Sequence, residues 1–201
     1  MQVYSLIKKF GFSIPYTPNV SLGSGADGET FSIAEDYNRV IKLSIIYDRG
    51  DFNIDTVFKK RNSLFKTIIN TKPLHLVNVY ECGFIGEDCR ITVDEKQRFI
   101  VYYYLMDKLN KISEDEKKVF HTILCHEDLN KKKNFSNDKI LTMLNGMIKG
   151  LDFNFEKVIM FYEAQKSSII KHNDFHVRNI MKDNFGNFKF IDLDRLDLRG
   201  I

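Results

Sequence analysis

The first half of the chain alternates apolar and polar positions, which is typical of half-buried β-strands. Residues 19–34 hold two such runs around a glycine-rich turn, and residues 39–46 form a third run. Residues 55–70 instead place apolar side chains on one helical face. Asp55 is the expected N-cap of this helix, and Pro73 would stop it. The pattern therefore predicts three strands followed by one helix.

Two more strands are predicted at residues 76–85 and 98–105, separated by a polar hairpin with room for another short strand. Beyond Met106 the apolar spacing becomes helical. Together these patterns predict an α+β fold. We expect an antiparallel sheet with one helix over residues 1–105 and a mainly helical part over residues 106–201.

The second half contains three predicted helices and a terminal hairpin. Ser113 and Glu116 form a capping box that opens the first helix. We expect this helix to end near Cys125, before a basic loop at residues 130–136. The remaining segments are predicted from helical periodicity and from turn residues. They are the helices at 138–151 and 155–168, and the hairpin strands at 179–182 and 188–192 with their turn at 183–187.

Composition excludes several classes of protein. The 201 residues are 43% apolar, enough for a packed core, and a net charge of +3 does not by itself point to nucleic acid or to a membrane. Three cysteines without C-x-x-C spacing argue against a disulfide framework or a zinc site. No run approaches ~18 apolar residues, so we expect no signal peptide and no membrane span. We expect a monomer that is cytoplasmic, or that is exported without a cleavable signal.

The first candidate for chemistry is the glycine-rich turn between the first two predicted strands. Its pattern, G-x-G-x-x-G, occurs in two unrelated nucleotide-binding folds. Because strand-like residues follow it, a loop between two antiparallel strands fits better than a strand-to-helix turn. Such a loop brings backbone N–H groups close to phosphates; a flexible hairpin tip without function is the alternative. The residues are Gly23, Ser24, Gly25, Ala26, Asp27 and Gly28.

Lys42 is a lone cation among the apolar residues of Val40–Leu43 in the third predicted strand. A buried ammonium is costly unless it is paired, and a nucleotide phosphate would supply the partner. The alternative is an ordinary lysine on the exposed side of the strand, since Val40 and Lys42 share one face by alternation.

The strongest signal lies in residues 172–195, HNDFHVRNIMKDNFGNFKFIDLDR. His172, Asp174 and Asn179 have the spacing H-x-D-x-x-x-x-N, and Asp192 follows the predicted hairpin. With the upstream lysine, these spacings resemble the catalytic loop and metal-binding aspartate of the protein-kinase-like superfamily, which includes aminoglycoside and choline kinases. The resemblance implies a two-lobed kinase fold that uses ATP and Mg²⁺.

This resemblance runs in order over residues 19–195 and implies a role for each polar residue of the motif. Asp174 would orient the acceptor hydroxyl and accept its proton. His172 belongs to the catalytic loop and would buttress it by hydrogen bonding more than react. Asn179 and Asp192 would bind magnesium through oxygen ligands.

On the nucleotide side, the resemblance assigns the phosphates to Lys42 and the glycine-rich turn. The adenine would bind backbone groups at the hinge, near Leu105 and Met106. Only nine residues follow Asp192, too few for the helices that usually form a substrate platform. The chain is in this respect similar to the small effector kinases that bacterial pathogens inject into host cells, and to some phage kinases.

Several positions depart from the family pattern. His176 stands where Ser/Thr protein kinases usually have Lys, which is more similar to aminoglycoside-type kinases. Leu193 and Asp194 replace the usual Phe-Gly after the metal-binding aspartate. The predicted helix at 55–70 contains no Glu, so the usual ion-pair partner of Lys42 is missing.

Three functions remain open from the sequence. The first is a Ser/Thr protein kinase, with a protein substrate that could belong to a host. The second is a kinase for a small molecule or glycan, such as an aminoglycoside, a choline-like compound or a lipopolysaccharide sugar. The third is a nucleotide-binding pseudokinase. None of the three predicts a nucleic-acid partner.

Overall fold

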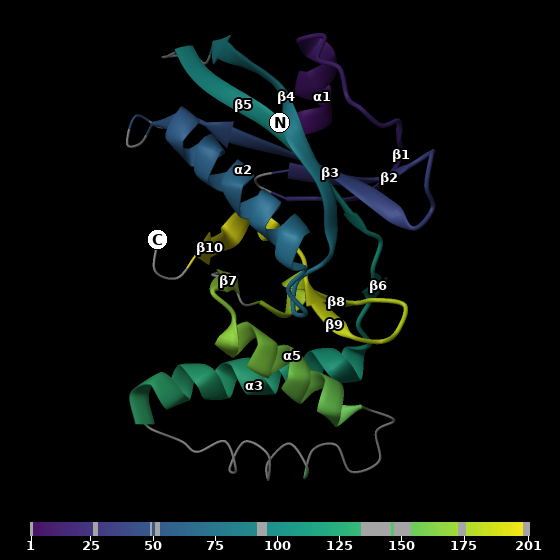
Figure 1. Cartoon of the computed structure of the whole chain (residues 1–201), viewed down its shortest axis with the longest axis vertical. Helices are drawn as coiled ribbons and strands as arrows, with labels where there is room; N and C mark the ends of the chain where they lie inside the picture. The colour runs from purple at the N-terminus through teal and green to yellow at the C-terminus, as the bar shows by residue number, and fades with distance from the viewer. Residues whose placement is uncertain are drawn as a thin grey trace. The chain divides into compact units, whose positions relative to one another are not determined.

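The structure is a computed structural model that describes residues 2–25, 28–48, 50, 53–91, 96–133, 146, 154–172 and 176–198. It has the predicted mixed α+β architecture, with an antiparallel five-stranded sheet early in the chain and helices later (Figure 1). The chain divides into two compact units. The first comprises Met1–Pro73 and Val77–Lys108, and the second comprises Leu74–Leu76 and Leu109–Ile201.

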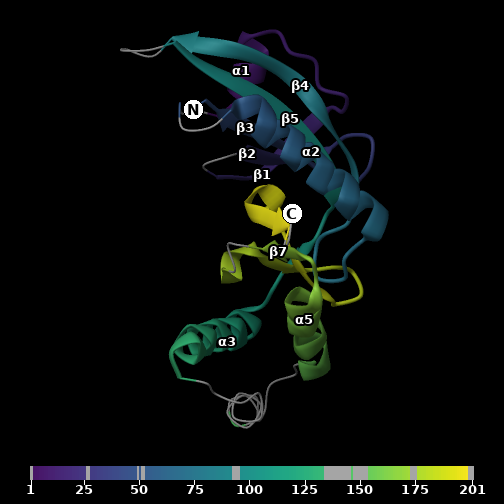
Figure 2. The same cartoon turned by 60° about the vertical axis from the view of Figure 1, so that its left-hand side comes forward.

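The first unit is a sheet with a helix on each face (Figure 2). Its strand order is β1-β2-β3-β5-β4, and all neighbouring strands are antiparallel. Three strands, a helix and two strands follow one another as predicted. They are preceded by a further helix: the elements are α1 (Val3–Lys9), β1 (Pro18–Ser24), β2 (Gly28–Ile33), β3 (Arg39–Tyr47), α2 (Ile54–Thr71), β4 (Val79–Ile91) and β5 (Lys96–Asp107).

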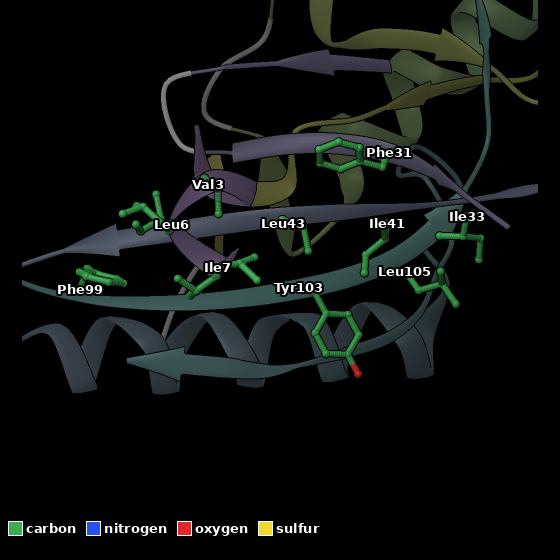
Figure 3. Packing of buried hydrophobic residues seen from close by; sticks show 12 residues of the cluster. Val3, Leu6, Ile7, Phe31, Ile33, Ile41, Leu43, Phe99, Tyr103 and Leu105 are labelled. Carbon is green, nitrogen blue, oxygen red and sulfur yellow. The ribbon is translucent and has the colours of Figure 1, made fainter. Parts of the chain in front are cut away.

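Side chains along β5 alternate between the two faces of this sheet. Phe99 and Tyr103 belong to the same apolar cluster as the buried residues of α1, which is drawn in Figure 3. Tyr102 and Tyr104 point the other way and contact Phe65 of α2, with ring centroids 6.2 Å and 4.7 Å apart, respectively. The two faces therefore have separate apolar layers. The α1 layer consists of Val3, Leu6, Ile7, Phe31, Ile33, Ile41, Leu43, Ile45, Phe99, Val101, Tyr103 and Leu105.

Helix α1 is absent from the sequence prediction, although Val3, Leu6 and Ile7 have the i, i+3, i+4 spacing of a helical face. A helix of seven residues is not stable in isolation, so its contacts must form it. Its three apolar residues are buried against the sheet. In addition, the buried carboxylate of Glu29 in β2 accepts a hydrogen bond from the backbone N–H of Tyr4 at 2.7 Å.

The N-cap predicted for α2 is wrong. The side chain of Asn53, and not that of Asp55, accepts the capping hydrogen bond, from the Thr56 N–H at 3.0 Å. Asp55 lies in the first turn, where its two oxygens accept hydrogen bonds from the guanidinium of Arg98 at 2.8 Å each. A carboxylate in the first turn suits the helix dipole, and here a bidentate ion pair with β5 fixes it.

Strands β4 and β5 are longer than predicted. β4 starts at Val79 and continues to Ile91, and β5 starts at Lys96. The polar stretch expected to form a hairpin with an extra short strand therefore consists largely of the extended ends of β4 and β5. Leu76, predicted to begin the strand, instead forms an isolated parallel bridge with Phe190 in the second unit.

The second unit combines helices with two small sheets, of strand orders β10-β7 and β6-β8-β9. No helix in the described part of the chain is long and apolar enough to cross a bilayer. The elements are β6 (Asn110–Lys111), α3 (Glu114–Lys133), α5 (Phe155–Ser167), β7 (Ile170–His172), β8 (Ile180–Lys182), β9 (Phe188–Phe190), β10 (Leu196–Leu198), and the 3₁₀ helices η1 (Val177–Asn179) and η2 (Leu193–Arg195).

The capping box predicted at the start of α3 is confirmed. The Ser113 hydroxyl accepts the Glu116 N–H at 3.2 Å, and the Glu116 carboxylate accepts the Ser113 N–H at 2.6 Å. The predicted end at Cys125 is wrong, because α3 continues to Lys133 and includes the start of the expected basic loop. The helix predicted at 138–151 lies outside the described residues apart from a single position.

Candidate functional site

The glycine-rich turn joins two antiparallel strands, β1 and β2, as predicted. Ser24 ends β1, and the backbone N–H of Gly25 donates a hydrogen bond to the carbonyl of Gly28 at 2.8 Å. Ala26 and Asp27, at the tip, lie outside the described residues. The strand-to-helix geometry of a dinucleotide-binding turn is thereby excluded, because a second strand follows the turn.

Of the three glycines in this turn, Gly28 is the one that packing among the described residues requires. A Cβ atom there would lie 2.5 Å from the carbonyl oxygen of Leu43 and 3.2 Å from Cε of Lys42. Any larger residue would displace β3, which carries that lysine. At Gly23 and Gly25 a Cβ atom would meet no atom of the described residues within 4 Å.

Lys42 is 8% exposed, which excludes the alternative of a lysine on the open side of its strand. Its strand lies between β2 and β5, and the register places Thr30 and Tyr104 directly beside it. Its ammonium nitrogen is 5.8 Å from the centroid of the Tyr104 ring, within the range of a cation–π interaction. On this face the sheet is covered by α2, whose single carboxylate, Asp55, is bound to Arg98.

Leu105 and Met106, the residues expected near the adenine, are buried at the end of β5. Their strand is paired on one side with β3 and on the other with β4. The first unit ends shortly after them, at Lys108. The predicted adenine-binding residues thus adjoin the segment where the chain passes from one unit to the other.

In the second unit, His172 is buried and holds the segment that carries Asp192. Its Nε2 atom lies 2.8 Å from the carbonyl oxygen of Ile191 and 3.2 Å from that of Asp192. Its ring stacks on Phe190, with centroids 4.7 Å apart. These contacts suit the buttressing role expected from the sequence. Asp174, two residues further along the predicted catalytic loop, lies outside the described residues.

Asn179 and Asp192 are brought together by the main chain. The backbone N–H of Ile191 donates to the carbonyl of Asn179 at 2.8 Å, which closes the base of the predicted hairpin. Asp192 adopts a left-handed conformation, with φ 59° and ψ 58°. A left-handed backbone costs an L-residue roughly 1–2 kcal/mol, and such strain persists only where surrounding contacts impose it. Backbone strain of this kind clusters at functional sites, so it supports a functional role for Asp192.

Aromatic packing anchors the hairpin to the helices of the second unit. Phe188 of β9 contacts Phe120 of α3 with ring centroids 4.8 Å apart, and Phe190 contacts Phe161 of α5 at 4.6 Å. Phe120 and Phe161 also contact each other, at 5.7 Å. Burial of an aromatic side chain stabilises a fold by about 1.5–3 kcal/mol. The segment that leads to Asp192 therefore rests on a buried aromatic layer.

Residues that depart from the family pattern have structural contacts of their own. The Nδ1 atom of His176 accepts the backbone N–H of Arg178 at 3.1 Å and so caps η1. Leu193, which follows Asp192, is fully buried. Asp194 is buried as well, with 4% of its surface exposed.

Two of the described site residues offer ligands suited to magnesium. Asn179 has an amide oxygen and Asp192 a carboxylate, and Mg²⁺ prefers such oxygen donors. Among the described residues, no group of three or more His, Cys, Asp or Glu side chains gathers as a metal site. The donor chemistry of Asn179 and Asp192 is therefore compatible with magnesium.

Sequence reasoning missed Tyr104 as a neighbour of Lys42. The only available signal was alternation within the run Tyr102–Tyr104, which does not reveal which tyrosine lies opposite the lysine. That pairing depends on the register between β3 and β5, two strands separated along the chain by a helix and by β4.

Comparison with known proteins identifies a similar fold but does not assign the chain to a sequence family. No family model matches the chain, and no curated protein gives a significant match. Among solved structures, the chain is similar to a ROP18 kinase domain in complex with AMP-PNP and sucrose, with a TM-score of 0.51 and 12% sequence identity. The alignment covers 90% of this chain and 52% of that one, so this chain spans about half its length. The chain has a mixed α+β, protein-kinase-like fold.

Proposed function

We propose that this chain is an ATP- and magnesium-dependent phosphotransferase that acts on a hydroxyl group, and that the acceptor is a Ser or Thr side chain of a protein. The observation that carries the proposal is the left-handed Asp192, held by His172 next to Asn179. The kinase-like fold supports it, and the similar ROP18 kinase domain was solved with AMP-PNP, an ATP analogue.

In this proposal the first unit binds the nucleotide. The backbone of the glycine-rich turn and the ammonium of Lys42 hold the phosphates, because N–H groups and a buried cation both favour oxyanions. Backbone groups near Leu105 and Met106 hold the adenine. Burial of Lys42 supports this role, since a largely desolvated ammonium needs an anionic or aromatic neighbour.

The second unit supplies the groups for transfer. Asp174 accepts the proton of the acceptor hydroxyl. The hydroxyl oxygen forms a bond to the γ-phosphorus of ATP, and the bond between that phosphorus and the ADP oxygen breaks. Asn179 and Asp192 would hold magnesium, which neutralises charge on the phosphates when bound. His172 keeps the main chain at Asp192 in its strained conformation through the carbonyls of Ile191 and Asp192.

A small-molecule or glycan acceptor is the second candidate. His176 favours it, because the sequence H-x-D-x-H-x-x-N is similar to that of aminoglycoside-type kinases. In this chain the His176 side chain also caps η1, so it has a local structural role whichever acceptor is used.

Labelled ATP tests the proposal directly. The chain is incubated with γ-labelled ATP and magnesium, alone, with a cell lysate, and with a panel of aminoglycosides and sugars. Label on protein Ser or Thr supports the proposal, and label on a small molecule supports the second candidate. Nucleotide binding without label in any tube would instead indicate a pseudokinase.

Three variants assign the transfer to the proposed residues. Asp174→Ala should abolish it, and Lys42→Ala and Asp192→Asn should each lower turnover by about 10²-fold or more, as for a lost electrostatic contact in a transition state. Circular dichroism and thermal unfolding should show the fold retained. Turnover unchanged in Asp192→Asn, or a variant that no longer folds, would count against a catalytic role for that residue.

A further inference from the structure

Helix α2 offers Lys42 no carboxylate at the position where the family pattern would supply one. Its sequence, IDTVFKKRNSLFKTIINT, contains a single acidic residue, Asp55. Asp55 lies in the first turn and is bound through both oxygens to Arg98 of β5. The neighbours of the buried Lys42 ammonium on α2 and the sheet are therefore of another kind.

Lys42 is linked to α2 through two aromatic rings in contact, Tyr104 of β5 and Phe65 of α2. Tyr104 is the register partner of Lys42 on β5 and is fully buried, and its ring centroid is 5.8 Å from the ammonium nitrogen. Behind it, Phe65 of α2 packs against the same ring with centroids 4.7 Å apart. On the opposite side of the lysine stem, Gly28 of β2 leaves only enough room for the Lys42 Cε. The stem is confined between a glycine and an aromatic face.

We propose that Tyr104 is a positioning residue for Lys42, and that its aromatic face, supported by Phe65 of α2, replaces the helix carboxylate that fixes the lysine in other kinase-like chains. An aromatic face attracts a cation without forming a full ion pair. This contact therefore helps to hold the ammonium in place without neutralising its charge. The consequence for phosphate binding rests on the proposed function, whereas the contact itself does not.

Tyr102 provides a matched control on the same strand and the same face. It is as deeply buried as Tyr104, and it also packs against Phe65, with centroids 6.2 Å apart. Its cationic neighbour is Arg61 of α2, whose guanidinium donates to the Tyr102 hydroxyl at 2.6 Å. Loss of either tyrosine ring removes similar packing, but only Tyr104 is the register partner of Lys42.

The test is a double-mutant cycle with two readouts. Tyr104→Leu, Tyr104→Phe and Tyr102→Leu are made in the wild-type chain and in Lys42→Met. The Kd for a fluorescent ATP analogue with magnesium is measured for each, together with the free energy of unfolding in urea. We expect Tyr104→Leu to weaken nucleotide binding about tenfold in the wild-type chain and not at all in Lys42→Met, as a lost cation–π contact predicts.

Tyr104→Phe keeps the aromatic face and should recover the affinity to within about twofold of wild type. Tyr102→Leu should lower stability about as much as Tyr104→Leu does while leaving the Kd close to wild type. If Tyr104→Leu and Tyr102→Leu weaken binding equally, or if the effect of Tyr104→Leu is the same in Lys42→Met, then Tyr104 only packs and the inference is wrong.

The two readouts separate this inference from the proposed function. A wild-type chain that binds no nucleotide would contradict the proposed function. The unfolding data would then still decide whether Tyr104 holds Lys42, because a contact between them makes the two stability losses non-additive. Strictly additive losses would overturn the inference even in a chain that binds ATP.

Discussion

Lys42 lies in the middle of a nine-residue strand with a partner strand on each side, so the register of the sheet sets its position. Asp192 follows a strand of only three residues and is held by side chains instead. His172 contacts its carbonyl oxygen, and Phe190 stacks on that histidine. The main chain of Lys42 should therefore tolerate changes in the neighbouring strands, and only its side chain depends on the contact with Tyr104. Asp192 should instead respond to each change in the side chains that hold it.

The largest effect is expected from Phe190→Ala. Phe190 is fully buried and contacts both Phe161 and His172, so its loss should lower the free energy of unfolding by about 3–5 kcal/mol. Urea unfolding measures this loss. Phe99→Ala, in the apolar layer of the first unit, is the matched control: we expect similar destabilisation but unchanged NMR signals for His172. A loss below about 1 kcal/mol for Phe190→Ala would show that the aromatic layer does not hold the hairpin.

His172→Phe should have a smaller effect on stability and a larger one on activity. Phenylalanine preserves the stack on Phe190 but cannot donate to the carbonyls of Ile191 and Asp192, which should cost about 1–3 kcal/mol. Transfer from labelled ATP should fall further than the folded fraction does. Thr30→Val, beside Lys42 on β2, is the corresponding change in the first unit and should alter transfer little. If His172→Phe and Thr30→Val lower transfer equally, then the two units do not differ in how they position these groups.

Local patterns were sufficient for much of the fold. Alternation predicted the first three strands, and turn chemistry predicted that the glycine-rich segment joins two of them. Ser113 and Glu116 predicted a helix start, because a capping box is decided within four consecutive residues. Helix α1 was missed since it depends on contacts with the sheet and on Glu29, which lies far from it in sequence.

For the candidate site, the sequence predicted residue identities but not their surroundings. The motif spacing singled out His172, Asn179 and Asp192. In the structure the His172 side chain contacts the main chain of Asp192, and the main chain of Asn179 is hydrogen-bonded to Ile191. The left-handed backbone of Asp192 could not be predicted, because aspartate adopts this conformation only occasionally and the contact from His172 is made by a residue twenty positions away. The position of Tyr104 beside Lys42 required the register of strands distant in sequence.

Asp192→Gly tests whether the strain at this residue is imposed by the fold. Glycine adopts the left-handed region without the steric cost borne by other residues, so the variant should be about 1 kcal/mol more stable than wild type. It should nevertheless transfer no phosphate, because the carboxylate is gone. Asp192→Ala loses the same carboxylate but keeps the strain, so it is the control. If the glycine variant is no more stable than the alanine variant, the conformation of Asp192 is not strained in solution.

The smallest effect is expected at the edge of the first unit, where Arg98 binds Asp55. Hydrogen bonds from the Arg98 guanidinium hold the pKa of the Asp55 carboxyl below its ordinary value. A carboxyl whose pKa is lower in the folded chain stabilises the fold above its unfolded pKa, and this contribution disappears as the pH falls through the folded pKa. Wild type should therefore lose more stability than Asp55→Asn between pH 7 and the acidic range below about pH 4. Because the pair is exposed to solvent, the difference should be small and should shrink in high salt. Thermal unfolding of both proteins across this pH range measures it, and parallel curves would mean that α2 does not depend on this ion pair.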